Sequence, residues 1–93
     1  MLFRSALRLG LFSRVVPHER LGAETMAFAR SLAAKPPVAL ALAKRAIYGS
    51  DTSDLEATLR VELDHQIRCF ETQDAVEGVS AFIEKRAATY RGR

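Results

Sequence analysis

Hydrophobic residues beyond position 17 recur every three or four residues, which is the period of an α-helix rather than of a strand. In the first such segment Leu21, Phe28 and Leu32 share one face, and nearby alanines raise the helix propensity. The segment Lys35–Pro37 must end this helix, because proline disfavours helical geometry in the residue before it. The pattern therefore predicts a helix between residues 17 and 35.

Two further helices are predicted from their start signals. Pro37 fits the first position of a helix, where its missing N–H group costs nothing, and the helix over Val38–Tyr48 has Gly49 as its stop. Ser53 and Glu56 form a capping-box pattern, in which each side chain reaches the other residue's exposed backbone N–H group. A long helix follows this cap.

The long helix has an apolar stripe that we expect to be buried. Its members are Leu55, Leu59, Leu63, Ile67 and Phe70. The polar segment 72–74 ends this helix and can cap a last one, which runs from about Ala75 to Ala88. Gly78 lies early in that last helix, where glycine costs about 1 kcal/mol relative to alanine, so we expect a close approach by another part of the chain.

The first 16 residues follow a different pattern. Ser5–Leu9 can form a short helix with Gly10 as its stop, and Leu11–Val16 has the pattern of an extended segment ended by Pro17. A single strand has unpaired backbone groups along both edges and is not stable by itself. The sequence therefore predicts an all-α chain with one unpaired extended segment, whose partners lie outside it.

Composition and charge exclude several classes of protein. The chain has 93 residues, of which 48% are hydrophobic and 27% charged, as in an ordinary single globular domain. The single cysteine excludes an internal disulfide framework, and no apolar run approaches the roughly 18 residues of a membrane span. The net positive charge lies at the two ends of the chain, and no basic stripe interleaves with aromatic residues. We expect no membrane insertion, no nucleic acid as partner and a reducing, cytoplasmic location.

No residue pattern in the chain predicts a catalytic site. His65 and Cys69 are four residues apart on one helix, but two ligands are too few for a metal site, so we expect no bound metal. A cysteine nucleophile would need a base and a third orienting group, and only His65 is near. Asp51, Asp54 and Glu56 cluster at a helix start, where the helix dipole explains them.

The start of the chain has two alternative explanations. Residues 1–18 contain three arginines and no acidic residue, which is a composition found in mitochondrial transit peptides. Leu2–Ser5 also matches the translation of a common sequencing-adapter tail, in which case residues 1–5 are not native. The mitochondrial matrix is therefore the alternative location.

Three stretches, in this order and at this spacing, resemble the C-terminal end of the enoyl-CoA hydratase/isomerase (crotonase) family. They are GLFSRVVP at 10–17, AAKPPVALALAK at 33–44, and FETQD followed by EGVSAFIEKR at 70–86. The resemblance covers about residues 6–93, and the last stretch is the most specific. It implies that residues 1–16 are the remnant of the connection from a catalytic core, and that residues 17–93 form a helical C-terminal subdomain.

The resemblance also implies where the chemistry lies. In the family, a core of repeated β-β-α units forms an α/β spiral that supplies two backbone N–H groups as an oxyanion hole and the acidic residues that move protons. No residue of this sequence matches those positions, so no catalytic residue is carried over. Some members place an aromatic residue near the acyl chain where this chain has Gln66, so the acyl preference is not transferred.

Phe82 and Lys85 match family residues near the coenzyme A nucleotide, often in a neighbouring subunit's site. Without the family, Phe82 would be read as a core residue and Lys85 as a solvated one. Coenzyme A enters as part of the acyl-CoA substrate, and no permanently bound cofactor is implied. The implied partners are an upstream catalytic core and neighbouring subunits of a trimer-based homo-oligomer.

We therefore expect a C-terminal part of an enoyl-CoA hydratase/isomerase that acts on acyl-CoA thioesters, with hydration of trans-2-enoyl-CoA as the expected reaction. The alternative is an autonomous helical module that binds another protein through its exposed apolar faces and has no enzymatic activity.

Overall fold

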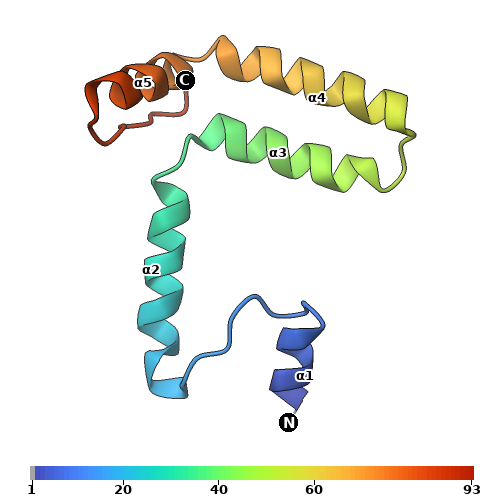
Figure 1. Ribbon diagram of the computed structural model, residues 1–93, viewed down its shortest axis with the longest axis vertical. Coiled ribbons are helices and arrows are strands. Elements are labelled where there is room, and N and C mark those ends of the chain that lie inside the picture. The colour runs from blue at the N-terminus through green and yellow to red at the C-terminus, as the bar shows by residue number, and fades with distance from the viewer. Residues whose placement is uncertain (1) are drawn as a thin grey trace. The chain divides into compact units, whose positions relative to one another are not determined.

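The computed structural model describes residues 2–93, and all the regular structure in that range is helical (Figure 1). The elements are α1 (Leu2–Arg8), the 3-10 turn η1 (His18–Arg20), α2 (Leu21–Ala33), α3 (Pro37–Ser50), α4 (Leu55–Phe70) and α5 (Gln73–Glu84). These residues divide into two compact units, one that extends to Leu32 and one over Ala33–Arg93. The expected all-α class is confirmed.

The first unit consists of α1, an irregular segment, η1 and most of α2. Gly10 has a φ of +77°, so it reverses the chain after α1 as a helix-stop glycine does. The following segment, predicted as extended over Leu11–Val16, forms no strand among residues 2–93. It is held to α2 by the Arg14 guanidinium, which lies 4.9 Å from the centre of the Phe28 ring.

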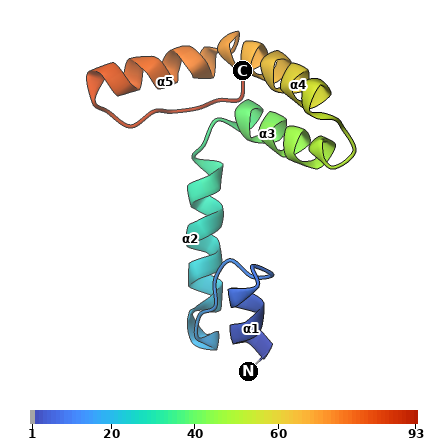
Figure 2. The same cartoon turned by 45° about the vertical axis from the view of Figure 1, so that its right-hand side comes forward.

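In the second unit, α3 and α4 lie side by side in both views (Figure 1, Figure 2). Pro37 is the first residue of α3, as predicted. The predicted capping box is wrong, because the N-cap of α4 is Asp54, whose Oδ1 accepts the N–H of Ala57 at 2.7 Å. The hydroxyl of Ser53 instead donates to the Gly49 carbonyl at 2.9 Å. A serine bonded to the preceding helix is no longer free to cap the next one.

Helix α3 continues past the glycine that was predicted to stop it. Gly49 lies within the last turn, and the helix ends after Ser50, whose hydroxyl donates to the Ile47 carbonyl at 2.7 Å. The serine thus satisfies a carbonyl that the helix end leaves unpaired. A glycine with ordinary helical dihedrals is tolerated inside a helix at a modest cost.

The apolar stripe predicted to be buried on α4 is exposed. Leu55 is 75% exposed, Leu63 62% and Phe70 68%. Helix α4 contacts α3 through a different face, which carries Thr58 and His65 among other residues. The prediction is wrong for the described residues because a helix buries the face that meets its neighbour, and α3 meets the more polar one.

We expect the isolated chain to self-associate. Leu42 and Ala81 are the only buried hydrophobic residues of the described range. Large hydrophobic side chains are exposed on several helices, among them Leu63, Phe70 and Ile83. Exposed apolar surface drives association, so sedimentation of the purified chain should give masses above the monomer. A strictly monomeric sample with a sharp two-state thermal transition would contradict this expectation.

Candidate functional site

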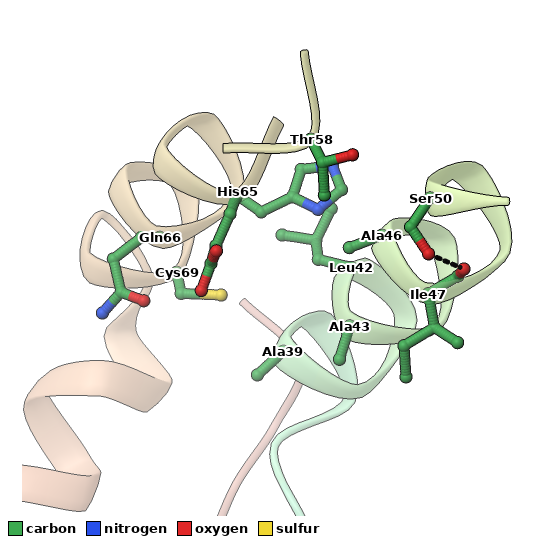
Figure 3. Close-up of a pocket in the computed structure, with 11 residues that line it drawn as sticks. Ala39, Leu42, Ala43, Ala46, Ile47, Ser50, Thr58, His65, Gln66 and Cys69 are labelled. Carbon is green, nitrogen blue, oxygen red and sulfur yellow. Dashed lines mark hydrogen bonds between the residues drawn. The ribbon is translucent and has the colours of Figure 1, made fainter. Parts of the chain in front are cut away.

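A groove of about 500 Å³ lies between α3 and α4 (Figure 3). Helix α3 contributes small and apolar side chains such as Ala39 and Leu42, and α4 contributes a more polar row. In Figure 3 His65 points from α4 toward Leu42, whereas Gln66 points away. The Nδ1 atom of His65 is buried and has no hydrogen-bond partner among the described residues.

The groove does not bring together a metal site or a catalytic set. His65 and Cys69 both line it, as their spacing predicts. Within residues 2–93 no group of three His, Cys, Asp or Glu side chains could hold a metal ion. Glu62 is the single acidic residue that lines the groove, so paired-carboxylate chemistry has no second partner there.

The second candidate region is α5 with the C-terminal tail, residues 86–93, which runs back along that helix (Figure 2). The N-cap of α5 is Thr72, whose Oγ1 accepts the N–H of Ala75 at 3.1 Å. The predicted cap within 72–74 is thereby confirmed. The first turn of the helix then supplies the residue that binds the end of the tail.

That residue is Asp74, which is only 4% exposed. Its two carboxylate oxygens accept the backbone N–H groups of Arg91 and Gly92, each at 2.7 Å. Its own N–H group donates to the Arg93 carbonyl at 3.0 Å. Asp74 therefore satisfies three backbone groups of the tail at once and fixes the tail against the start of α5.

The predicted close approach at Gly78 is also present. A Cβ atom on Gly78 would lie 3.3 Å from the Tyr90 hydroxyl oxygen, and one on Gly92 would lie 3.1 Å from Pro37 Cγ. Gly92 also has a φ of +75°, which side-chain-bearing residues rarely adopt. The two glycines let the tail pack between α5 and the start of α3.

Glu77 binds the tail at a second point. Its Oε1 and Oε2 accept two N–H groups of the Arg86 guanidinium at 2.6 and 2.9 Å, and Oε1 also accepts the Thr89 N–H at 2.8 Å. The bond from Arg86, followed by that from Thr89, lowers the pKa of Glu77 from 4.5 to about 2. The bonds to Glu77 and then Glu84 raise the pKa of Arg86.

Because the folded-state pKa of Glu77 is depressed, its ionised form stabilises the fold at pH values above about 4.5. This contribution is lost as the pH falls from there through about 2. The Glu77 carboxylate that accepts from Arg86 is therefore ionised at neutral pH.

Helix α5 ends at Glu84, four residues before the predicted end at Ala88. Lys85 adopts the left-handed conformation, with φ 55° and ψ 40°. Its N–H donates to the Phe82 carbonyl at 3.3 Å, and the Arg86 N–H donates to the Ala81 carbonyl at 3.0 Å. This is the pattern of a Schellman motif. Glycine usually occupies that position, because the left-handed conformation costs other residues about 1–2 kcal/mol.

Phe82 and Lys85 both lie at this C-terminal end of α5. Phe82 is 85% exposed, so it is not a core residue in the described structure, and Lys85 is exposed as well. An exposed aromatic ring can stack on a planar base, and an ammonium at the same helix end can bind an anionic group. Sequence reasoning found this pair through the family resemblance but missed Glu77 and Arg86, whose nine-residue separation matches no helical spacing.

No helix in residues 2–93 is both long enough and apolar enough to cross a membrane.

The family model for enoyl-CoA hydratase/isomerase matches residues 3–93. Crotonyl-CoA hydratase from Syntrophomonas wolfei is 36% identical over 85 residues, which are 91% of this chain and 33% of that protein. The 1,2-epoxyphenylacetyl-CoA isomerase of Escherichia coli is 37% identical over 84 residues, 90% of this chain and 32% of that protein.

Solved structures agree with the sequence relatives. An enoyl-CoA hydratase from Bacillus anthracis superposes with a TM-score of 0.91 at 34% identity, over 97% of this chain and 35% of that one. A structure from Geobacillus kaustophilus gives a TM-score of 0.89 at 36% identity, over 97% of this chain and 34% of that one. The chain thus spans about a third of the length of these relatives. It belongs to the enoyl-CoA hydratase/isomerase family.

Proposed function

We propose that this chain is the helical C-terminal part of an acyl-CoA hydratase, and that it forms the edge of the coenzyme A site through Phe82 and Lys85. Relatives named crotonyl-CoA hydratase and short-chain-enoyl-CoA hydratase support hydration as the reaction. A catalytic core of the family, which residues 2–93 do not contain, supplies the oxyanion hole and the proton-transferring acids in this proposal.

Within that division of labour, the residues of this chain bind and orient the substrate. Hydration adds water across the α,β double bond of the thioester, and negative charge develops on the thioester oxygen. Two of the acidic side chains form ion pairs with arginines, Glu56 with Arg60 at 2.6 Å and Glu77 with Arg86 at 2.6 Å. The nucleotide part of coenzyme A is remote from the reacting carbons, and binding it fixes the position of the thioester.

The observation that carries the proposal is the presence of an exposed aromatic ring and an exposed lysine at one helix end. Phe82 exposes 85% of its surface, and Lys85 occupies a left-handed position that favours glycine. The exposed ring adds no buried area to the described fold, and the left-handed turn places Lys85 at the same helix end. Both side chains gain a role if the ring packs against the adenine base and the ammonium meets a phosphate of coenzyme A.

We further propose that the exposed stripe of α4 packs against the catalytic core or against neighbouring subunits of a trimer-based homo-oligomer. The stripe is apolar over the length of α4, as obligate interfaces are. The same stripe favours the alternative function, an autonomous module that binds another protein.

Relatives named as mitochondrial occur in Mus musculus and Dictyostelium discoideum, so a mitochondrial location stands beside the cytoplasmic one.

Replacing Lys85 tests the coenzyme A assignment, in the enzyme that joins this chain to its catalytic core. A partly exposed charge contact contributes on the order of 1 kcal/mol, so Lys85→Ala should raise KM for an enoyl-CoA substrate about fivefold. The turnover number should stay nearly constant, because uniform binding is lost from a non-reacting part of the substrate. Steady-state kinetics at low and high salt measures both values, and the effect should shrink in high salt.

Three controls separate the ammonium from the turn that carries it. Lys85→Gly keeps the left-handed turn and should raise KM as much as Lys85→Ala does. Lys44→Ala, at an exposed lysine of α3, should leave KM unchanged. An enoyl-pantetheine substrate, which lacks the nucleotide, should not respond to either Lys85 substitution. Equal loss with the truncated substrate would show that Lys85 is structural and would refute the assignment.

A further inference from the structure

We propose that Glu77 is a positioning residue for coenzyme A binding. Its contacts with the C-terminal tail make α5 end at Glu84 and thereby hold Lys85 in its left-handed conformation. This inference rests on the proposed function of Phe82 and Lys85. Glu77 itself touches no substrate in the proposal. It acts through Arg86, the residue that follows Lys85.

The local sequence alone favours a different end for the helix. Lys85, Arg86, Ala87 and Ala88 all have high helix propensity, and their pattern predicts a helix that continues to Ala88. Helix propagation adds one hydrogen bond for each residue fixed. An interaction outside the helix must therefore favour the observed end.

Glu77 provides that interaction. It lies two helical turns before Glu84, and its carboxylate binds Arg86 and the Thr89 N–H at once. In a helix extended to Ala88, Arg86 would lie nine residues beyond Glu77, which is not a neighbouring position on a helix surface. The bidentate contact and the extended helix thus exclude each other.

The end of α5 affects the direction in which the Lys85 side chain leaves the backbone. Lys85 lies between the helix end and the bound Arg86, and its side chain makes no hydrogen bond or ion pair among the described residues. Its backbone dihedrals therefore set the direction in which the side chain leaves the helix end. In a helix extended to Ala88, Lys85 would adopt helical dihedrals instead of φ 55° and ψ 40°, and its side chain would leave the backbone in a different direction. Two states of one turn thus correspond to two placements of the same charge.

Glu77→Gln in the enzyme with its catalytic core tests the inference. The substitution keeps the shape of the side chain but removes the charge that favours Arg86. KM for an enoyl-CoA substrate should rise about threefold to fivefold at constant turnover number, and KM for the enoyl-pantetheine substrate should not change. Glu56→Gln, which removes an exposed ion pair on α4, is the matched control and should change neither value.

Coupling between the two residues distinguishes positioning from a merely structural role. In the Lys85→Ala background, Glu77→Gln should raise KM no further, because the ammonium to be positioned is already gone. The exchanged pair Glu77→Arg with Arg86→Glu should restore part of the loss. If Glu77→Gln does not assemble, Arg86→Lys keeps the charge, loses the bidentate geometry and should show the same pattern.

The inference is overturned if KM is unchanged in Glu77→Gln and Arg86→Lys, if the two losses simply add in the double variant, or if the pantetheine substrate suffers equally. The positioning role of Glu77 fails, while the coenzyme A role of Lys85 stands, if Lys85→Ala raises KM and the Glu77 and Arg86 variants do not. If Lys85→Ala itself leaves KM unchanged, the proposed function fails first and the positioning role fails with it.

Discussion

The 93-residue chain by itself is expected to leave a short trans-2-enoyl-CoA unhydrated. Enzymes accelerate their reactions by about 10⁶-fold or more, and that acceleration needs charge-stabilising donors and acids held around the reacting atoms. The groove of about 500 Å³ between α3 and α4 is lined by a single carboxylate, Glu62. Loss of the conjugated enoyl absorbance should therefore proceed at the rate of the buffer alone.

The matched experiment joins the chain to a catalytic core of the family, where turnover should appear. Turnover by the isolated chain clearly above the buffer rate would contradict the division of labour proposed for it. In that case Glu62→Gln and His65→Gln would show whether the groove between α3 and α4 is the source.

Local signals were sufficient to predict where most helices lie. Pro37 begins α3 and Thr72 caps α5, as expected. Gly10 follows α1 with a positive φ. These residues act through the dihedrals or hydrogen bonds of their own turn, so the residues that interact are neighbours in the sequence. The prediction that Gly78 is closely approached also held, because a glycine inside a helix needs a reason.

Features that depend on distant parts of the chain were not predictable. The face of α4 that contacts its neighbour is set by where α3 lies, and the apolar stripe with Leu63 pointed to the wrong face. The end of α5 is set by Glu77 and Arg86, which lie nine residues apart across a chain reversal. Propensity describes each residue with its nearest neighbours and contains no term for such a contact.

The candidate site was predictable only in part. Phe82 and Lys85 came from the resemblance, and their role in coenzyme A binding stays a prediction. The left-handed conformation of Lys85 was not foreseen, since lysine has no preference for it. The boundary between residues 1–16 and 17–93 also stays a prediction.

Asp74 is the residue whose loss should most affect the tail. Asp74→Ala would leave the N–H groups of Arg91 and Gly92 without their acceptors, in a place where the aspartate is only 4% exposed. An unsatisfied buried donor costs about 1–3 kcal/mol, so the free energy that keeps the tail closed should fall by about 3 kcal/mol. A decrease of about 3 kcal/mol in the free energy of opening corresponds to roughly 150-fold faster amide exchange in the tail.

Hydrogen–deuterium exchange of the C-terminal peptide, in the enzyme with its catalytic core, measures this opening. Asp74→Asn should give an intermediate exchange rate. Its amide keeps one oxygen acceptor for one of the two backbone N–H groups, but its NH₂ group faces the other N–H, so two donors meet. Asp64→Asn, which removes an exposed ion pair with Arg68 at 3.8 Å, should leave exchange in the tail unchanged. Unaltered exchange at Arg91 and Gly92 in Asp74→Ala would mean that Gly78 and Tyr90 hold the tail without the carboxylate. The expected order, alanine above asparagine above the native residue, follows from counting the acceptors that each side chain offers.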